Sequence, residues 1–163
     1  MRRTPFIPLA ALVLWGCSDP SGGPKATNVT ITPGSIAMNA VGATQIVHAA
    51  VTDQGGKAMK NASLSWSSSS AAATVASLGG DSALVTAAAN GSAEVTATAG
   101  SAKNSVTVEV VQAAAAILKL EGDQQIAKVG TVLSTPLKVK VVDRLGAPVA
   151  GQSVGFNVNG GGS

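Results

Sequence analysis

The residues of this chain that could carry out chemistry are few, and they lie far apart in the sequence. His48 is the only histidine and Cys17 is the only cysteine. A zinc site needs several such ligands, and a Ser-His-Asp triad needs a histidine that is buried and oriented. His48 occupies a water-facing position of an alternating segment, and Ser67 to Ser70 have no base in reach. The sequence therefore predicts that the protein is not an enzyme and has no metal site and no cofactor.

A second group of candidates consists of acidic residues near predicted turns: Asp53, Asp81, Glu121, Asp123 and Asp143. Calcium takes six to eight oxygen ligands, whereas these acids are isolated from one another in the sequence. An aspartate in a turn commonly accepts hydrogen bonds from its own backbone. We expect that role here, and calcium binding at a junction between modules is the alternative.

The charge of the chain does not predict a nucleic-acid partner. The sequence of 163 residues has a net charge of +3 and a pI of about 9.3. Arg2 and Arg3 lie in a segment that we expect to be removed, and without them the net charge falls from +3 to +1. The remaining charges are scattered and form no basic stripe, and no glycine-rich phosphate loop is present.

The N-terminal segment, residues 1–16, predicts an export signal. A short basic start is followed by an apolar run from Phe6 to Trp15. This run has the length of a signal-peptide core and is too short to span a bilayer. A buried helix of the folded protein is the alternative, but a Gly/Pro/Ser-rich linker over residues 17–25 follows at once.

The end of this run, Leu14-Trp15-Gly16-Cys17, resembles the lipobox of bacterial lipoproteins. The resemblance implies that Cys17 is acylated and becomes the mature N-terminus, although Trp15 stands where the family usually has a small residue. Several acyl chains would hold the protein stably on a membrane. Because Ser18 follows the cysteine instead of aspartate, the resemblance favours the outer membrane over the inner one.

Residues 26–112 predict an all-β module, because apolar and polar residues alternate with a period of two. Val47, Ala49 and Val51 point one way while Ile46, His48 and Ala50 point the other way. Such alternation is typical of strands with one buried face and one wet face. Turn signals rich in glycine separate the segments, which favours a β-sandwich.

This module resembles the group-2 bacterial immunoglobulin-like domain. The resemblance rests on Val29-Thr30-Ile31, Leu64-Ser65-Trp66-Ser67-Ser68, the segment from Asn90 to Ala97, and the final strand from Ser105 to Val110. It implies an immunoglobulin-like β-sandwich of the seven-strand type. Trp66 would be the large core aromatic between the two sheets, with a structural role.

Residues 115–163 resemble the first half of a group-1 bacterial immunoglobulin-like domain, of the invasin and intimin type. The resemblance rests on Gly122 to Gln125, Pro136 to Asp143, Gly146 to Gly151 and Val154 to Gly162. A full module needs about seven strands, and this stretch predicts three or four. We expect that the chain is a fragment of a longer surface protein; docking of these strands on the first module or on another copy is the alternative.

These features predict a structural or adhesive module protein, anchored to the bacterial envelope through its lipid. Its surface ligand, a protein or a glycan, is not indicated by the sequence. The alternative function is a carbohydrate-binding accessory module of a larger secreted enzyme. Such modules usually present aromatic platforms, whereas Trp66 and Phe156, the only aromatic residues after the signal, are both interpreted as core.

Overall fold

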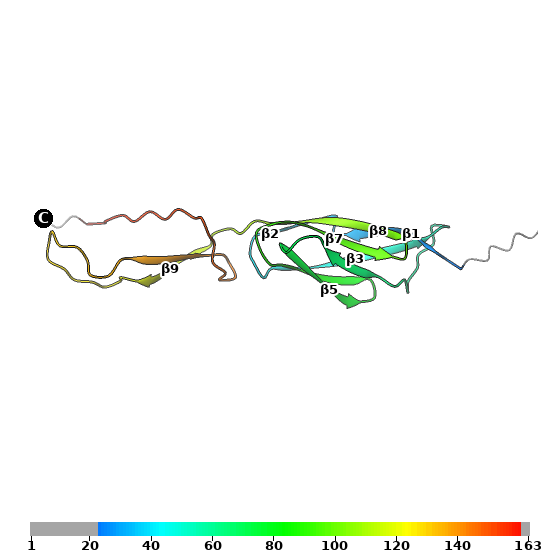
Figure 1. The fold of residues 1–163 in the computed structure, drawn as a ribbon, viewed down its shortest axis with the longest axis horizontal. Coiled ribbons are helices and arrows are strands. Elements are labelled where there is room, and N and C mark those ends of the chain that lie inside the picture. The colour runs from blue at the N-terminus through cyan, green and yellow to red at the C-terminus, as the bar shows by residue number, and fades with distance from the viewer. Residues whose placement is uncertain (1–22, 161–163) are drawn as a thin grey trace, which may run out of the picture.

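The computed structural model describes residues 23–160. The export signal and Cys17 lie outside these residues. The described chain forms two modules that lie end to end along one long axis (Figure 1). It contains strands and turns but no helix, so it contains none that could cross a bilayer.

The first module consists of eight strands in two four-stranded sheets. The strands are β1 (Ala26–Thr32), β2 (Ser35–Met38), β3 (Thr44–Asp53), β4 (Ser65–Ser68), β5 (Ala73–Gly79), β6 (Ser82–Ala87), β7 (Gly91–Ala99) and β8 (Ala102–Val110). One sheet has the order β1-β3-β6-β5 and the other has the order β2-β8-β7-β4. Without β2, this is the strand arrangement of a constant-type immunoglobulin domain. The predicted all-β, immunoglobulin-like sandwich is therefore confirmed.

The first module has one strand more than the seven-strand type because its N-terminal strand is divided between the two sheets. β1 pairs antiparallel with β3, and after Pro33-Gly34 the chain crosses over so that β2 pairs parallel with β8. A proline has no N–H to donate to a ladder, so it suits such a crossing point. The parallel pairing was not predicted.

The core of the first module follows the predicted alternation. Val47, Ala49 and Val51 are buried on β3, whereas Ile46 on the opposite face is 45% exposed. The largest fully buried side chains are all valines, including Val85, Val95 and Val108; most of the other buried residues are alanines. The two sheets therefore enclose a core of small side chains.

The second module begins with two antiparallel strands, β9 (Ala116–Glu121) and β10 (Lys138–Val142). It repeats part of the first module at one constant spacing: Val51, Asp53, Gly56 and Trp66 correspond to Val141, Asp143, Gly146 and Phe156. Because β3 pairs with β1 and β10 pairs with β9, the two strands of the second module correspond to β1 and β3.

The rest of the second module forms no further strand among the described residues. The segment 154–158 corresponds to β4, and in the first module β4 pairs with β7. No strand corresponding to β7 is present in residues 116–160, so 154–158 has no partner to pair with. Phe156 is therefore 58% exposed, and its interpretation as a core residue is wrong for the described chain.

Candidate functional site

The structure brings His48 next to two residues that the sequence analysis did not connect with it. His48 lies at the end of the β3–β6 ladder, opposite Ser82. The Ser82 hydroxyl lies 2.9 Å from His48 Nδ1 and donates a 2.8 Å hydrogen bond to Asp81 Oδ1. His48 Nδ1 lies 3.8 Å from the same carboxylate oxygen. The only histidine therefore belongs to a small Ser-His-Asp cluster at one end of the two central strands of the first sheet.

This cluster does not have the geometry of a catalytic triad. In a triad the serine and the aspartate bond to different nitrogens of the imidazole ring. Here both lie on the Nδ1 side of His48, and the Ser82 hydroxyl donates its hydrogen bond to Asp81. The hydrogen bond from Ser82 is the main cause that lowers the pKa of Asp81. More than half of the His48 side chain is exposed to water, so the cluster is a surface polar contact.

The serines that follow Trp66 form hydrogen bonds between their hydroxyl groups and backbone groups of nearby residues. The Ser68 hydroxyl donates to the carbonyl of Ala73, and the Ser69 hydroxyl accepts the N–H of Glu94 at 2.8 Å. The Ser70 hydroxyl accepts the N–H of Ala72. These contacts connect the edge strand β4 to its neighbours, and none of them involves a base.

Two of the five acidic candidates form ion pairs on the surface of the second module. Asp123 pairs with Lys119, and this hydrogen bond lowers the pKa of Asp123. Glu121 lies 2.8 Å from Lys138 across the β9–β10 ladder. Within residues 23–160 no three histidine, cysteine or acidic residues gather as metal ligands would.

Asp53 and Asp143 build the same turn, one in each module. Oδ1 of Asp53 accepts the N–H groups of Gly55 and Lys57, both at 2.9 Å. Oδ1 of Asp143 accepts those of Leu145 and Ala147, at 2.9 and 3.0 Å. The prediction that turn carboxylates bond to their own backbone is confirmed for these two residues.

The two aspartates differ in their second oxygen. Oδ2 of Asp143 accepts the N–H of Val41, in the turn between β2 and β3, at 2.9 Å. It also accepts the side-chain amide of Gln112, in the linker, at 2.9 Å. These bonds cross from the second module to the first. Asp143 is only 2% exposed and is the one buried polar residue of the described chain.

The linker between the modules is hydrogen-bonded along its length. The N–H groups of Val111 and Ala113 donate to the carbonyls of Met38 and Asn39 in the first module, and both distances are 2.9 Å. The N–H of Ala115 donates to Val142 in the second module at 2.8 Å. Each module therefore holds part of the linker backbone.

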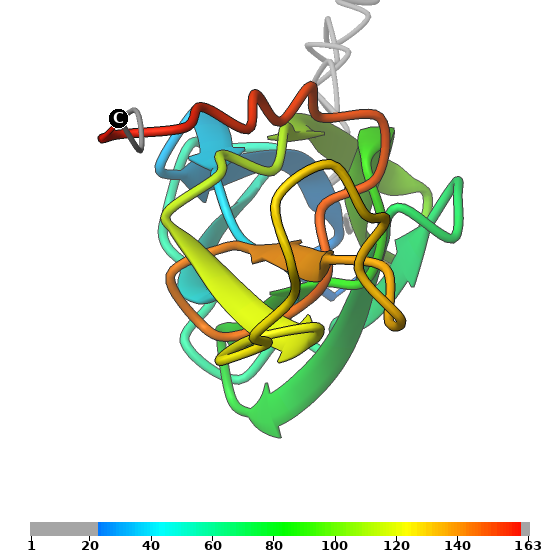
Figure 2. The same ribbon diagram turned by 90° about the vertical axis from the view of Figure 1, so that its left-hand side faces the viewer.

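The apolar side of the second module contains two open hollows. One, of about 250 Å³, is lined by Leu137, Val139 and Phe156 together with charged residues of β9. The other, of about 290 Å³, lies beside the linker and is lined by Ile117, Val141 and neighbouring small residues. In the first module the second sheet packs over the corresponding face of β1 and β3. Figure 2 views the chain end on, with β9 and β10 in front of the first module.

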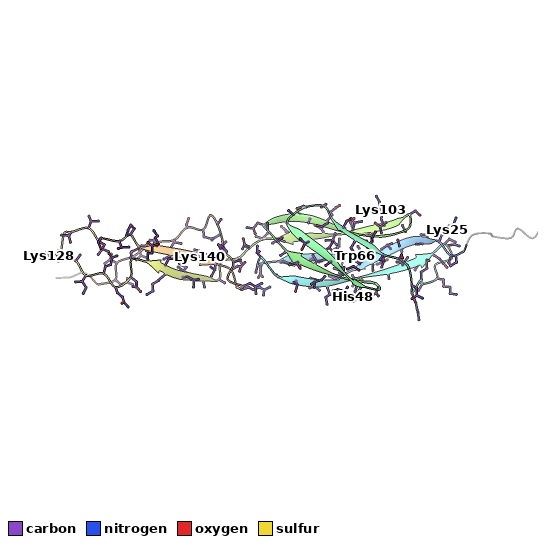
Figure 3. The ribbon with its side chains drawn as sticks, turned by 60° about the horizontal axis from the view of Figure 1, so that its bottom comes forward. Lys25, His48, Trp66, Lys103, Lys128 and Lys140 are labelled. Carbon is purple, nitrogen blue, oxygen red and sulfur yellow. The ribbon has the colours of Figure 1, made fainter. Side chains whose placement is uncertain are left out.

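Trp66 lies within the first module, while His48, Lys25 and Lys103 lie toward its periphery (Figure 3). The Trp66 side chain is partly buried and packs against the core cluster. Its indole Nε1 is buried without a hydrogen-bond partner among the described residues. The indole is therefore a packing group and not a recognition platform.

Comparison with known proteins gives structural neighbours but no family. No protein-family model and no curated protein matches the chain. Domains 4 and 5 of the S-layer protein SbsC align at 23% identity with a TM-score of 0.48, over 54% of this chain and 53% of that one. The Escherichia coli adhesin FdeC aligns at 21% identity with a TM-score of 0.43, over 80% and 44% of the two chains.

The adhesin InvE of Yersinia pseudotuberculosis aligns at 18% identity with a TM-score of 0.45, over 82% of this chain and 46% of that one. The chain thus spans about half the length of each of these three structures. At TM-scores this low, the assignment of the fold rests on the strand order described above.

Sequence reasoning missed both polar groupings because each depends on pairing between distant strands. His48 and Ser82 are joined only by the register of β3 against β6. Asp143 reaches Val41 only because the linker turns the second module onto the β2–β3 turn. The repeated Val-x-Asp-x-x-Gly pattern of Asp53 and Asp143 was the one signal in the sequence that related the two turns.

Proposed function

We propose that this chain is part of an exported, lipid-anchored envelope protein in which immunoglobulin-like modules serve as a structural or adhesive spacer. The observation that carries this proposal is the end-to-end arrangement of two related modules, joined by a linker that is hydrogen-bonded to both (Figure 1). Such an arrangement gives the protein an extended length and gives the second module a defined direction relative to the first. A cleft with clustered catalytic groups would instead support an enzyme, and the described residues place no such cluster in a cleft.

We further propose that the first module is of the group-2 type, and that the second is the first part of a group-1 module. The partial repeat supports an immunoglobulin-like nature of the second module, since β9 and β10 correspond to β1 and β3 and carry an uncovered apolar face. In this proposal strands equivalent to β7 and β8 cover that face in a longer surface protein, while strands equivalent to β5 and β6 extend the sheet of β9 and β10. An uncovered apolar sheet is otherwise an aggregation hazard.

The anchor in this proposal is Cys17, which lies outside the described residues. Acylation of Cys17 would place the first module directly above the membrane, after a short linker over residues 17–25. Growth of an expressing bacterium with labelled palmitate should label the wild-type protein and leave Cys17→Ala unlabelled. Equal labelling of the two proteins, or of neither, would remove the anchor from the proposal.

An adhesive role is separated from a purely structural one by a binding screen against glycans and extracellular matrix proteins. The alternative function, a carbohydrate-binding accessory module, predicts glycan binding that Phe156→Ala abolishes, because Phe156 is the exposed aromatic of the described chain. A structural spacer predicts no binding in either panel. Binding to a matrix protein that survives Phe156→Ala supports adhesion.

A further inference from the structure

We propose that Asp143 is a latch between the modules: one oxygen builds its own turn, and the other fixes the orientation of the second module on the first. This inference deepens the proposed spacer role, because a spacer of defined reach needs a fixed angle at each junction. It concerns the junction alone and does not depend on the lipid anchor.

The burial of Asp143 is the first argument. Burying a carboxylate is costly unless it is fully hydrogen-bonded. Asp143 meets this requirement by accepting four N–H groups, two on each oxygen, at distances of 2.9 to 3.0 Å. Because N–H groups point at both oxygens, they form a lining suited to an anion, and the Asp143 carboxylate occupies it.

The comparison with Asp53 is the second argument. The turn around Asp53 has the same backbone bonds as the turn around Asp143, including the bonds from Asp53 N to Lys57 O and from Asp143 N to Ala147 O. Asp53 builds this turn with Oδ1 alone. The two bonds to Oδ2 of Asp143 are therefore not needed for the turn, and their effect is to connect the modules.

The donors to Oδ2 are themselves held in place. Val41 is the second residue of a turn closed by the bond from Ala43 N to Ala40 O, with Gly42 next at a φ of 84°. Gln112 donates its backbone N–H to Asn90 Oδ1 at 2.7 Å, while its side-chain amide bonds to Asp143 and, at 3.3 Å, to Pro148 O. Both donors are thus held by bonds that do not involve the Asp143 carboxylate.

Neighbouring contacts support the same orientation. Arg144 Nε donates to Asn39 Oδ1 at 2.9 Å. The side chain of Leu145 lies over Gly42, at 3.8 Å from where a Cβ would be. The buried residues of the second module, Val142, Asp143 and Val149, all lie on the two arms of this turn. The turn at Asp143 is therefore where the second module is anchored.

The test measures residual dipolar couplings of the isotope-labelled chain, because these report the relative orientation of two parts of a molecule. One alignment tensor should fit the amides of 26–110 and of β9–β10 together in the wild type. In Asp143→Asn the amide offers only one oxygen; the turn keeps it, as the turn at Asp53 uses a single oxygen, and the junction loses its acceptor. The couplings of β9–β10 should then shrink relative to those of the first module. The matched variant Asp53→Asn should behave as wild type, because its single oxygen suffices for the turn.

A second variant leaves Asp143 and its turn untouched. Proline is favoured at the second position of a turn whose third residue is glycine with positive φ, so Val41→Pro keeps the turn and removes the donor. Combined with Gln112→Ala it should separate the two alignment tensors while the cross-strand contacts of β9–β10 persist. One tensor for both modules in this double variant would overturn the latch, and so would loss of the β9–β10 contacts in it. Separate tensors in the wild type would overturn the latch as well. Equal effects of Asp53→Asn and Asp143→Asn would also overturn it.

Discussion

At the scale of single residues, two aspartates with the same local sequence have different surroundings and therefore different consequences. Asp53 is half-buried, and only its Oδ1 accepts a bond. Asp143 is buried, and both of its oxygens accept bonds. The hydrogen bond from Gln112 is the largest cause that lowers the pKa of Asp143, and backbone N–H groups lower it further.

The lowered pKa of Asp143 predicts how the junction depends on pH. Because the folded-state pKa lies below the usual value of about 3.9, the ionised carboxylate stabilises the junction fully above that value. This stabilisation is lost as the pH falls through the lowered pKa. The Arg144 side chain bonds to Asn39 and not to Asp143. The turn at 39–43 and the linker at 111–115 contain no charged residue, so neither segment adds a charge beside the Asp143 carboxylate.

Dipolar couplings measured against pH should therefore show one alignment tensor for both modules from neutral pH down to about 4, and separation only in stronger acid. A melting curve would be a poorer measurement, since Asp81 and Asp123 also have lowered pKa values. Separation of the two alignment tensors already between pH of about 7 and pH of about 5 would contradict the role given to the ionised carboxylate.

Trp66 offers a second prediction at this scale. Its ring packs against a core of small side chains, so Trp66→Ala should lower the free energy of unfolding by about 3 kcal/mol, the low end of the range for large aromatics. Trp66→Phe removes the unpartnered indole N–H and should cost less than about 1.5 kcal/mol. Urea unfolding followed by circular dichroism gives both values. Two variants as stable as the wild type would mean that the ring does not support the core.

At the scale of elements, the second module depends on the close approach of Gly122 to the backbone of Pro136. Gly122 follows β9 at a φ of 83°, and a Cβ there would lie 2.6 Å from the backbone oxygen of Pro136. Gly122→Ala should therefore push the loop 122–136 away and weaken the end of the β9–β10 ladder. Amide chemical shifts of Lys138 and Val139 should change, while Gly155→Ala, which meets no atom, should leave them unchanged. Unchanged shifts in Gly122→Ala would contradict this packing.

The strands were predictable from the sequence wherever a valine or alanine face alternates with polar residues. The alternation of β3, β7 and β8 predicted which side chains are buried. The pairing of these strands was not predictable in detail, because alternation defines a face but not a partner. The parallel β2–β8 pairing and the exposure of Phe156 depend on which strands are neighbours. The junction at Asp143 likewise requires the position of one whole module on another.

At the scale of the whole molecule, the described chain combines an eight-stranded sandwich with a second module whose two strands correspond to β1 and β3 of the first. The first module encloses its core between two sheets, whereas the apolar residues of the second module, such as Leu137 and Phe156, remain exposed. Within the second module, burial is confined to the junction with the first. The position of the second module on the first should therefore rest on the junction, while the pairing of β9 with β10 should be only locally stable.

Amide hydrogen exchange on the monomeric chain tests this central claim most directly. Amides in a complete core exchange only through global unfolding, whereas an uncovered sheet exchanges by local opening. The account predicts strong protection at Val95 and Val108 in the first module and much weaker protection at Val139 and Val141 in the second. Equal protection at these four valines in a monomer would contradict the account, because the second module would then be complete in itself.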